Sequence, residues 1–129
     1  RNRTHVAMDG MGVFAFTMSK VPKCIKNLLE NFCIDVDEVD YLLLHQANQY
    51  IDEKIRKKMR FSKDKTPYCL EKFGNTSSGT IPMTMVTKIS EQLRGGKNKL
   101  VMSGFGAGLS WAAVYVETEF IEVLPLIEI

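Results

Sequence analysis

The amino-acid sequence predicts an α/β domain in which helices cover a mixed sheet of about four to five strands. A buried strand is predicted over Val39–Leu44, where a short apolar run ends at His45. Segments of helical period separate it from two strand-like segments near the end of the chain, Lys99–Ser103 and Ser110–Glu119, which together indicate a hairpin. Counting a short strand at His5–Asp9, closed by a turn, the expected order is β-α-β-α-β-β.

Length and composition narrow the possible classes of protein. The 129 residues suit one domain, and 17 basic against 15 acidic residues make no global case for a nucleic-acid or membrane partner. We find no apolar run long enough to span a membrane and no signal peptide, and the first residue, Arg1, suggests a piece of a longer chain. Cys24, Cys33 and Cys69 lack CxxC spacing, so we expect neither disulfides nor a metal site, but a reducing cytoplasm.

The first long helix is predicted over Met11–Phe32, where apolar residues recur at steps of three and four. Pro22 lies inside this segment and is expected to kink or split the helix, with Ser19 as a second N-cap. Cys24 and Cys33 are expected to be small buried side chains beside it. An acidic loop over residues 34–38 then leads into the strand.

A second helix is predicted over Gln49–Arg60, with an apolar stripe of Ala47, Ile51, Ile55 and Met59. Its other side is basic, and the run comprises Lys54, Arg56, Lys57, Lys58, Arg60, Lys63 and Lys65. A solvated helix face is the default interpretation of such a run. A docking surface for an acidic partner is the functional interpretation, and nucleic-acid binding is a weaker one because few aromatic residues are interleaved.

Glycines and a proline set the predicted bounds of the remaining elements. A short helix over Tyr68–Phe73 is expected to end at Gly74, and residues 75–79 form a polar turn. A longer helix follows, with Pro82 in its first turn and with Ile81, Met85, Ile89 and Leu93 at steps of four. Residues 1–119 are assigned to the domain, and the apolar and acidic tail, 120–129, stays unassigned.

Three stretches carry candidate chemistry. His45 ends a strand, so its ring can donate a hydrogen bond to a developing oxyanion or be a satisfied structural histidine. Asn75 follows Gly74 and offers a second neutral donor or a plain helix cap. The turn expected at Gly104–Gly108 brings backbone N–H groups close to a substrate oxygen or only to its own strands. It is not a phosphate loop, because a strand follows it.

The order and spacing of these motifs resemble the C-terminal half of a β-ketoacyl-acyl-carrier-protein synthase III, a condensing enzyme of thiolase-like fold. The similar stretches are HQAN at His45–Asn48, GNTSSGTIP at residues 74–82 and GFGAGLSW at Gly104–Trp111. The resemblance runs from about Met8 to about Glu119 and implies a thiolase-like half with acyltransferase activity in the whole enzyme.

The resemblance implies roles for individual residues. His45 and Asn75 match the catalytic histidine and asparagine that polarise the thioester carbonyl of malonyl-acyl carrier protein and stabilise the enolate left after decarboxylation. Phe105, Gly106 and Ala107 match the loop that helps to form the oxyanion hole of the acyl-enzyme, with the Ala107 N–H as donor. The substrates are acyl-CoA and malonyl-acyl carrier protein, and no cofactor is implied.

The resemblance also implies partners. The family's nucleophilic cysteine lies in an N-terminal half, and none of Cys24, Cys33 and Cys69 matches it, so the chain alone is expected to be inactive in condensation. The segment beside the pantetheine tunnel, which contacts the carrier protein, corresponds to Gln46, Ala47, Asn48, Gln49 and Tyr50. Tyr50 replaces an arginine that is common in the family, and Lys57 and Lys58 could supply the charge instead.

The whole enzyme is expected to be a cytoplasmic homodimer that binds neither nucleic acid nor a membrane. Two alternatives stay open. One is a non-catalytic module that docks a carrier protein or CoA, and the other is a related condensing enzyme of secondary metabolism.

Overall fold

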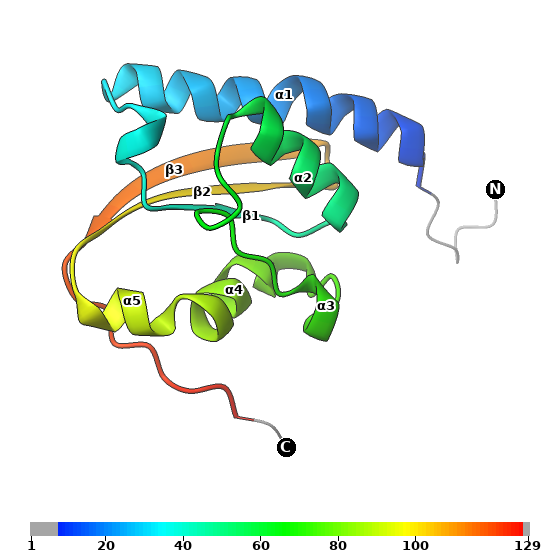
Figure 1. Cartoon of the computed structure of the whole chain (residues 1–129). Coiled ribbons are helices and arrows are strands. Elements are labelled where there is room, and N and C mark those ends of the chain that lie inside the picture. The colour runs from blue at the N-terminus through cyan, green and yellow to red at the C-terminus, as the bar shows by residue number, and fades with distance from the viewer. Residues whose placement is uncertain (1–7, 128–129) are drawn as a thin grey trace.

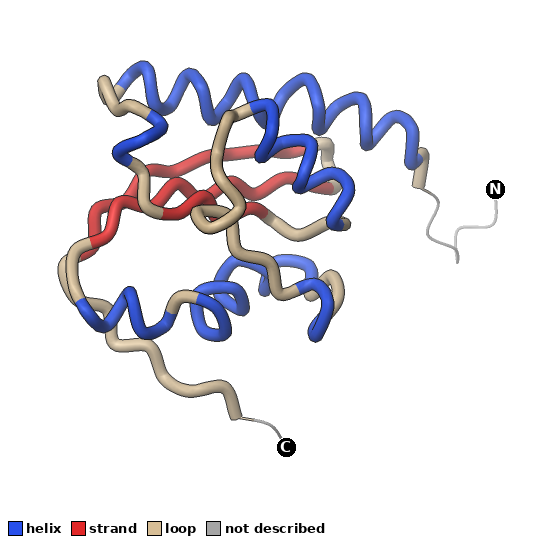
Figure 2. Tube along the Cα trace, viewed as in Figure 1, coloured by secondary structure: helices blue, strands red, loops and turns tan. Residues whose placement is uncertain are grey.

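The computed structural model describes residues 8–127. Two groups of helices enclose the sheet: α1 and α2 cover one face, and α3, α4 and α5 lie against the other (Figure 1). Figure 2 shows the same three layers, with the strands between the helices. Most of the strand predicted at His5–Asp9 lies outside the described residues, and Met8 and Asp9 form no strand.

The sheet is mixed, as predicted. β1 (Tyr41–Leu44) pairs in parallel with β2 (Asn98–Gly106), which pairs antiparallel with β3 (Ser110–Thr118). The order is β1-β2-β3, so the described residues contain three strands rather than four or five.

An irregular segment occupies the position where a further strand could pair with β1. The Leu42 N–H donates to the Lys65 carbonyl at 2.7 Å, on the edge of β1 that β2 does not use. Pro67 lies two residues further on and has no N–H to continue a ladder. The contact with β1 is therefore a single bond rather than a strand pairing.

α1 (Gly10–Asn31) is one helix of 22 residues with Pro22 inside it, so of the two predicted outcomes, a kink or a split, the split is wrong. The Asp9 carboxylate accepts from the Gly12 N–H at 3.0 Å and caps the helix, instead of forming a turn with Gly10. Ser19 donates to the Phe16 carbonyl and caps nothing. Pro22 has no N–H to donate within the helix. The apolar face of α1 is buried on the sheet, and this packing stabilises the helix despite the missing hydrogen bond.

α1 ends beside two local features that also differ from the prediction. Cys33 is exposed rather than buried and has a positive φ of 54°. The acidic loop contains a 3-10 turn at Val36–Glu38, in which Asp35 and Glu38 form a capping box.

α2 (Gln49–Lys58) begins at the cap Asn48, whose side chain accepts from the Ile51 N–H at 2.9 Å. The predicted apolar stripe is confirmed at Ile51 and Ile55 of α2 and at Met59, the C-cap, since all three are buried. Arg56 is a correction to the predicted basic side. It is 8% exposed and bonds the Glu53 carboxylate and the Phe61 carbonyl.

The opposite layer begins with α3 (Leu70–Phe73), which ends at Gly74 as predicted, with a φ of 64°. A 3-10 turn at Ser77–Gly79 leads into α4 (Thr80–Lys88). The prediction of one long helix is wrong at Ile89, whose φ of −132° separates α4 from α5 (Ser90–Gly95). Ile89 is 2% exposed, so its side chain fills the core at the break.

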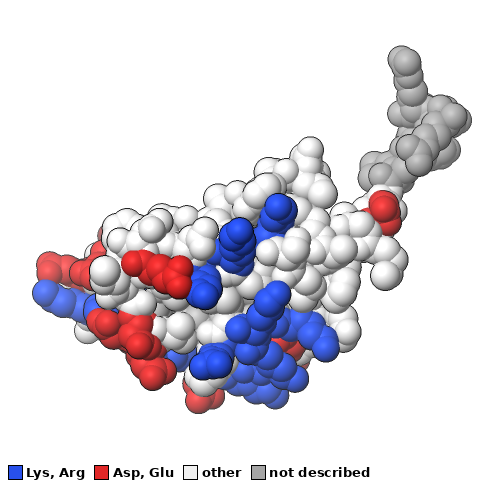
Figure 3. All heavy atoms as spheres, turned by 90° about the horizontal axis from the view of Figure 1, so that it is seen from above, with Lys and Arg blue, Asp and Glu red and all other residues white. Residues whose placement is uncertain are grey.

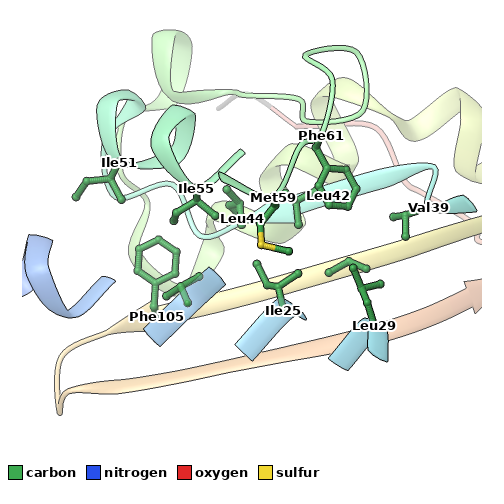
Figure 4. Close-up of a cluster of buried hydrophobic side chains, with 12 residues drawn as sticks. Ile25, Leu29, Val39, Leu42, Leu44, Ile51, Ile55, Met59, Phe61 and Phe105 are labelled. Atoms are coloured by element: carbon green, nitrogen blue, oxygen red, sulfur yellow. The ribbon is translucent and has the colours of Figure 1, made fainter. Parts of the chain in front are cut away.

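One hydrophobic cluster lies on each face of the sheet. Because side chains alternate along a strand, Leu42 and Leu44 enter the cluster beneath α1 and α2, and Leu43 enters the other. Figure 4 shows the first cluster, in which Ile25 and Leu29 of α1 approach side chains of α2, β1 and β2.

The second cluster includes Val123, so the chain after β3 packs on the domain although residues 120–127 form no helix or strand. The Ile121 N–H donates to the Leu93 carbonyl at 3.1 Å and fixes this segment to α5. Over residues 8–127, no helix is both long and apolar enough to cross a membrane.

Candidate active site

A pocket of about 770 Å³ opens where β1 and β2 reach their carboxyl ends. Its walls include His45 after β1, Asn75 and Thr80 from the segment that begins α4, and the end of the β2–β3 hairpin with Phe105 and Trp111. The carboxyl edge of parallel strands is where open α/β sheets hold ligands. The structure thus brings together the three stretches that the sequence singled out.

His45 is fixed at both its backbone and its ring. Its N–H donates to the Ser103 carbonyl at 2.8 Å, which extends the pairing of β1 with β2 by one residue. Its ring atom Nδ1 lies 2.8 Å from Oγ1 of Thr80, and the Phe105 ring meets the imidazole edge-on at 5.3 Å. Since Nδ1 is directed at Thr80, Nε2 is the ring nitrogen left for a ligand in the pocket.

Burial favours the neutral form of the His45 imidazole. Burial lowers the pKa of His45 below its ordinary value, and the nearby Ser77 carbonyl opposes this shift. A neutral imidazole carries one N–H and one lone pair, so the ring can donate a hydrogen bond without bearing charge.

Asn75 is oriented by its own backbone turn. Its Oδ1 accepts from the Ser77 N–H at 2.8 Å, and its Nδ2 lies 3.4 Å from the Ala47 carbonyl. The amide oxygen is occupied and one Nδ2 hydrogen is donated to the Ala47 carbonyl, so the second Nδ2 hydrogen is the part available to the pocket. α4 begins without a side-chain cap, so Asn75 does not cap that helix.

The glycine-rich stretch differs from the predicted turn. Phe105 and Gly106 belong to β2, where they pair with Trp111 and Ser110, and the turn begins only at Ala107. Phe105 is 8% exposed and contributes to the first hydrophobic cluster. All three predicted residues, Phe105, Gly106 and Ala107, line the pocket with His45.

Gln46 differs from the expectation of a carrier-protein contact, because it is 1% exposed. Its Nε2 donates to Oγ1 of Thr84 at 2.6 Å and to the Pro67 carbonyl at 3.3 Å. Its Oε1 accepts from the Cys69 N–H at 2.9 Å. The side chain therefore joins β1 to the neighbouring segments and leaves no surface for a partner.

The other residues of the predicted carrier segment lie nearer the surface. Gln49 and Tyr50 are exposed, whereas Ala47 is half-buried and Asn48 serves as the α2 cap. The Tyr50 ring stacks on Phe14 with centroids 5.9 Å apart. Tyr50 is therefore exposed in the first turn of α2, which we call the rim of α2, and Phe14 of α1 supports its ring.

A basic surface lies on the outer side of α2 and the loop after it, formed by Lys54, Lys57, Lys58, Arg60 and Lys63, all exposed. Figure 3 shows Lys and Arg side chains gathered on the face that α1 and α2 form. We call the five named residues the α2 basic surface. Lys57 and Lys58, predicted from the sequence, both belong to it.

Cys69 is buried and its thiol has a defined hydrogen-bonding role. Its Sγ lies 3.3 Å from Oγ1 of Thr84, and that hydroxyl donates its single hydrogen to the Thr80 carbonyl at 2.8 Å. The Cys69 thiol is thus paired with a buried hydroxyl of α4. Among residues 8–127, no group of three or more His, Cys, Asp or Glu side chains could hold a metal ion.

Sequence reasoning did not find Thr80 and Thr84 as parts of the site. They stand four residues apart at the start of α4, on one face of the helix, and both are buried. The signal in the sequence was the pair of threonines at a spacing of four. The apolar stripe at the same spacing in this segment drew the prediction to the core instead.

Comparison with known proteins gives one family. Residues 29–118 match the family described as 3-Oxoacyl-[acyl-carrier-protein (ACP)] synthase III C terminal. The chain is 40% identical over 114 residues to the beta-ketoacyl-[acyl-carrier-protein] synthase III of Streptococcus gordonii, covering 87% of this chain and 35% of that protein. The Oceanobacillus iheyensis protein of the same name is 39% identical over 110 residues, with 85% and 35% covered. The chain thus spans about a third of the length of these relatives.

Solved structures agree with this match. The 3-oxoacyl-(acyl-carrier protein) synthase of Burkholderia xenovorans superposes with a TM-score of 0.87 at 32% identity, covering 92% of this chain and 34% of that one. The priming β-ketosynthase of the R1128 polyketide pathway gives 0.77 at 26% identity, with 88% and 34% covered. The predicted thiolase-like α/β fold is confirmed by these superpositions.

Proposed function

The chain belongs to the family of 3-oxoacyl-[acyl-carrier-protein] synthase III C-terminal domains, and on this premise we propose that it supplies half of the active site of a condensing enzyme. The observation that carries the proposal is that His45 and Asn75, far apart in the sequence, line one pocket with their donor atoms available. Two neutral donors that reach one space are suited to an oxygen on which negative charge develops.

The first step is decarboxylation of malonyl-acyl carrier protein. The bond between the carboxylate carbon and the α-carbon breaks, carbon dioxide leaves, and the electron pair stays on the thioester as an enolate. Nε2–H of His45 and Nδ2–H of Asn75 donate to the enolate oxygen. Both groups are held before the reaction, so little reorganisation is needed when the charge appears.

The second step forms the new carbon–carbon bond. The enolate carbon attacks the carbonyl carbon of an acyl thioester held on a cysteine of an N-terminal half. The π electron pair of that carbonyl moves to its oxygen. The backbone at Phe105–Ala107, with the Ala107 N–H as the donor, stabilises that oxyanion until the cysteine thiolate leaves. The proposed steps draw on no cofactor, and the acyl group arrives as acyl-CoA.

Docking of the acidic carrier protein uses the rim of α2. Gln49 and Tyr50 are exposed beside the α2 basic surface, and opposite charges across an interface mainly raise the rate of encounter. We assign no carrier contact to the buried side chain of Gln46. The whole enzyme is proposed to be a cytoplasmic homodimer, in which the N-terminal half completes the pocket.

The test is a chimera in which residues 8–119 replace the matching segment of the Streptococcus gordonii enzyme. Release of carbon dioxide from malonyl-acyl carrier protein is measured for the wild-type chimera and for His45→Ala and Asn75→Ala. Each variant is expected to lose about 10²–10³ in kcat, the usual effect of removing one such donor. The exposed Gln92→Ala, in α5 and away from the pocket and the α2 basic surface, is the matched control for folding. Unchanged decarboxylation in His45→Ala would refute the role.

A second candidate function is a non-catalytic module that docks a carrier protein or CoA, which the α2 basic surface favours. The two functions differ in what the gene encodes before Arg1. A preceding segment with a cysteine nucleophile supports the condensing enzyme, whereas a start codon immediately before Arg1 supports the docking module. The superposition on a polyketide ketosynthase keeps secondary metabolism as an alternative pathway for the same chemistry.

A further inference from the structure

The hydroxyl of Thr80 is buried against the ring of His45. Thr80 is the first residue of α4, is 1% exposed, and brings Oγ1 to 2.8 Å from Nδ1. This contact bears on which ring nitrogen carries the proton, and its importance rests on the proposed role of His45 as a neutral donor.

The hydrogen of the Thr80 hydroxyl has two acceptors within reach. One is Nδ1 of His45 at 2.8 Å, and the other is the Ser77 carbonyl at 3.1 Å. The Ser77 carbonyl already accepts from the backbone N–H of Thr80. In a neutral imidazole only one nitrogen can accept, so donation to Nδ1 requires the ring proton to be on Nε2.

We propose that Thr80 is a positioning residue that donates its hydroxyl hydrogen to Nδ1 and thereby keeps the proton of His45 on Nε2. An Nε2–H can donate to an enolate oxygen in the pocket. In the other tautomer a lone pair would face that oxygen, and the interaction would be repulsive rather than stabilising.

A closed set of bonds holds Thr80 in this position. Gln46, the residue after His45, donates to Oγ1 of Thr84 at 2.6 Å, and that hydroxyl donates to the Thr80 carbonyl at 2.8 Å. The circuit His45–Gln46–Thr84–Thr80 returns to His45 through Nδ1. Gln46, Thr84 and Thr80 are each at most 1% exposed, so water does not compete for these bonds.

The Ser77 carbonyl is the group that opposes the proposed arrangement. A carbonyl beside Nδ1 favours a proton on that nitrogen, and Thr80 would then accept from His45 and donate to Ser77. The two arrangements place the same atoms at the same distances and differ in the position of one proton on the ring. Nuclear magnetic resonance of the ring nitrogens separates them.

The experiment uses this chain labelled with ¹⁵N in its histidine rings, at a pH where they are neutral. The chain has two histidines, and His5→Gln identifies the signals of His45. The wild type is expected to show His45 with Nε2 protonated and Nδ1 as an acceptor. Thr80→Ser, which retains the hydroxyl, should keep this spectrum, and Thr80→Val, which removes it at similar volume, should shift His45 toward mixed tautomers.

A wild-type spectrum with the proton on Nδ1 would overturn the inference at once, even if Thr80→Val failed to fold. An unchanged tautomer in a folded Thr80→Val would do the same. In the chimera, Thr80→Val should lower kcat by no more than the loss of the donor itself, about 10²–10³, and Thr80→Ser should restore most of it. If His45→Ala leaves decarboxylation unchanged while the spectra behave as expected, the proposed function fails and the tautomer assignment stands.

Discussion

Gln46 and Thr84 join the end of β1 to α4 through a bond of 2.6 Å between Nε2 and Oγ1. The amide oxygen of Gln46 also accepts from the Cys69 N–H at 2.9 Å, so both ends of the side chain are used inside the protein. A buried polar group whose partners are all present adds stability and fixes geometry, whereas a partly paired one is unfavourable. The distance between β1 and α4, and thus between His45 and Thr80, depends on this glutamine.

Gln46→Leu should therefore destabilise the chain. The substitution removes the bonds to Thr84 and to the Cys69 N–H and leaves buried groups unpaired, at about 1–3 kcal/mol for each group left without a partner. We expect the free energy of unfolding, measured in urea, to fall by at least about 2 kcal/mol. The exposed Gln49→Leu is the control and should change it by about 0.5 kcal/mol or less. Equal midpoints for the two variants would contradict this role of Gln46.

Asp52 makes the stability depend on pH. It is 0% exposed, its carboxyl oxygens have no hydrogen-bond partner among the described residues, and burial, with a smaller effect of Glu53, raises its pKa to about 8. Between the unfolded pKa of about 4 and this value, the folded chain binds a proton that the unfolded chain does not. The contribution of Asp52 is therefore most favourable below pH 4 and is lost as the pH rises toward 8.

The neutral variant Asp52→Asn isolates this effect. The difference in unfolding free energy between the variant and the wild type should grow in favour of the variant from pH 5 to pH 8, by on the order of a few kcal/mol. Urea unfolding at three pH values measures the slope. Asp64→Asn, at an exposed position, is the control. Parallel pH profiles for wild type and Asp52→Asn would show that the carboxyl is already ionised in the folded chain.

The chain alone should not become acylated on Cys69. That thiol is 1% exposed, and its Sγ lies 3.3 Å from Oγ1 of Thr84 inside the protein, so it is not accessible to a thioester. After incubation with acetyl-CoA, the intact mass should show no stoichiometric adduct. Iodoacetamide provides the positive control, since it should modify the exposed Cys33 in the folded chain and all three cysteines after unfolding. A stoichiometric acetyl group on Cys69 would mean that this chain carries its own nucleophile.

Reversal of one charge on the α2 basic surface should weaken carrier binding. Lys57→Glu is expected to raise the dissociation constant for an acyl carrier protein several-fold, about 10-fold at low salt, with a smaller effect as ionic strength increases. Calorimetric titration of the chain with the carrier measures it. Lys97→Glu is the matched control, because Lys97 is exposed in a different region and pairs with Glu119 at 2.7 Å. Equal losses for both variants would indicate a general effect of charge rather than a docking surface.

The sequence predicted the features that depend on local pattern. The strand predicted over Val39–Leu44 contains β1, which begins two residues later at Tyr41, and the stripe Ile51, Ile55 and Met59 is buried. In both cases the period of the apolar residues determines which side chains face the core. The convergence of His45 and Asn75 followed from the position of His45 at a strand end and from the resemblance of the motifs.

Features that depend on tertiary contacts were not predictable in this way. Ile89, which separates α4 from α5, has its side chain in the core. The apolar stripe at steps of four is therefore uninterrupted there, and the sequence pattern gives no sign that α4 ends. Arg56 looked like part of a solvated face, but Glu53 and the Phe61 carbonyl hold it inside. The contact of Thr80 with His45 joins residues from two elements, and no local pattern encodes it.

The short stretch between β1 and α2 contains both a buried residue that holds the pocket and an exposed residue on the surface. Gln46 is enclosed by the network that holds the pocket, whereas Tyr50 is 63% exposed on the rim of the next helix. Under the proposed function, recognition of the carrier and the chemistry at His45 therefore depend on separate groups of residues. A substitution at Tyr50 or Lys57 would then change the partner surface without moving the atoms around His45.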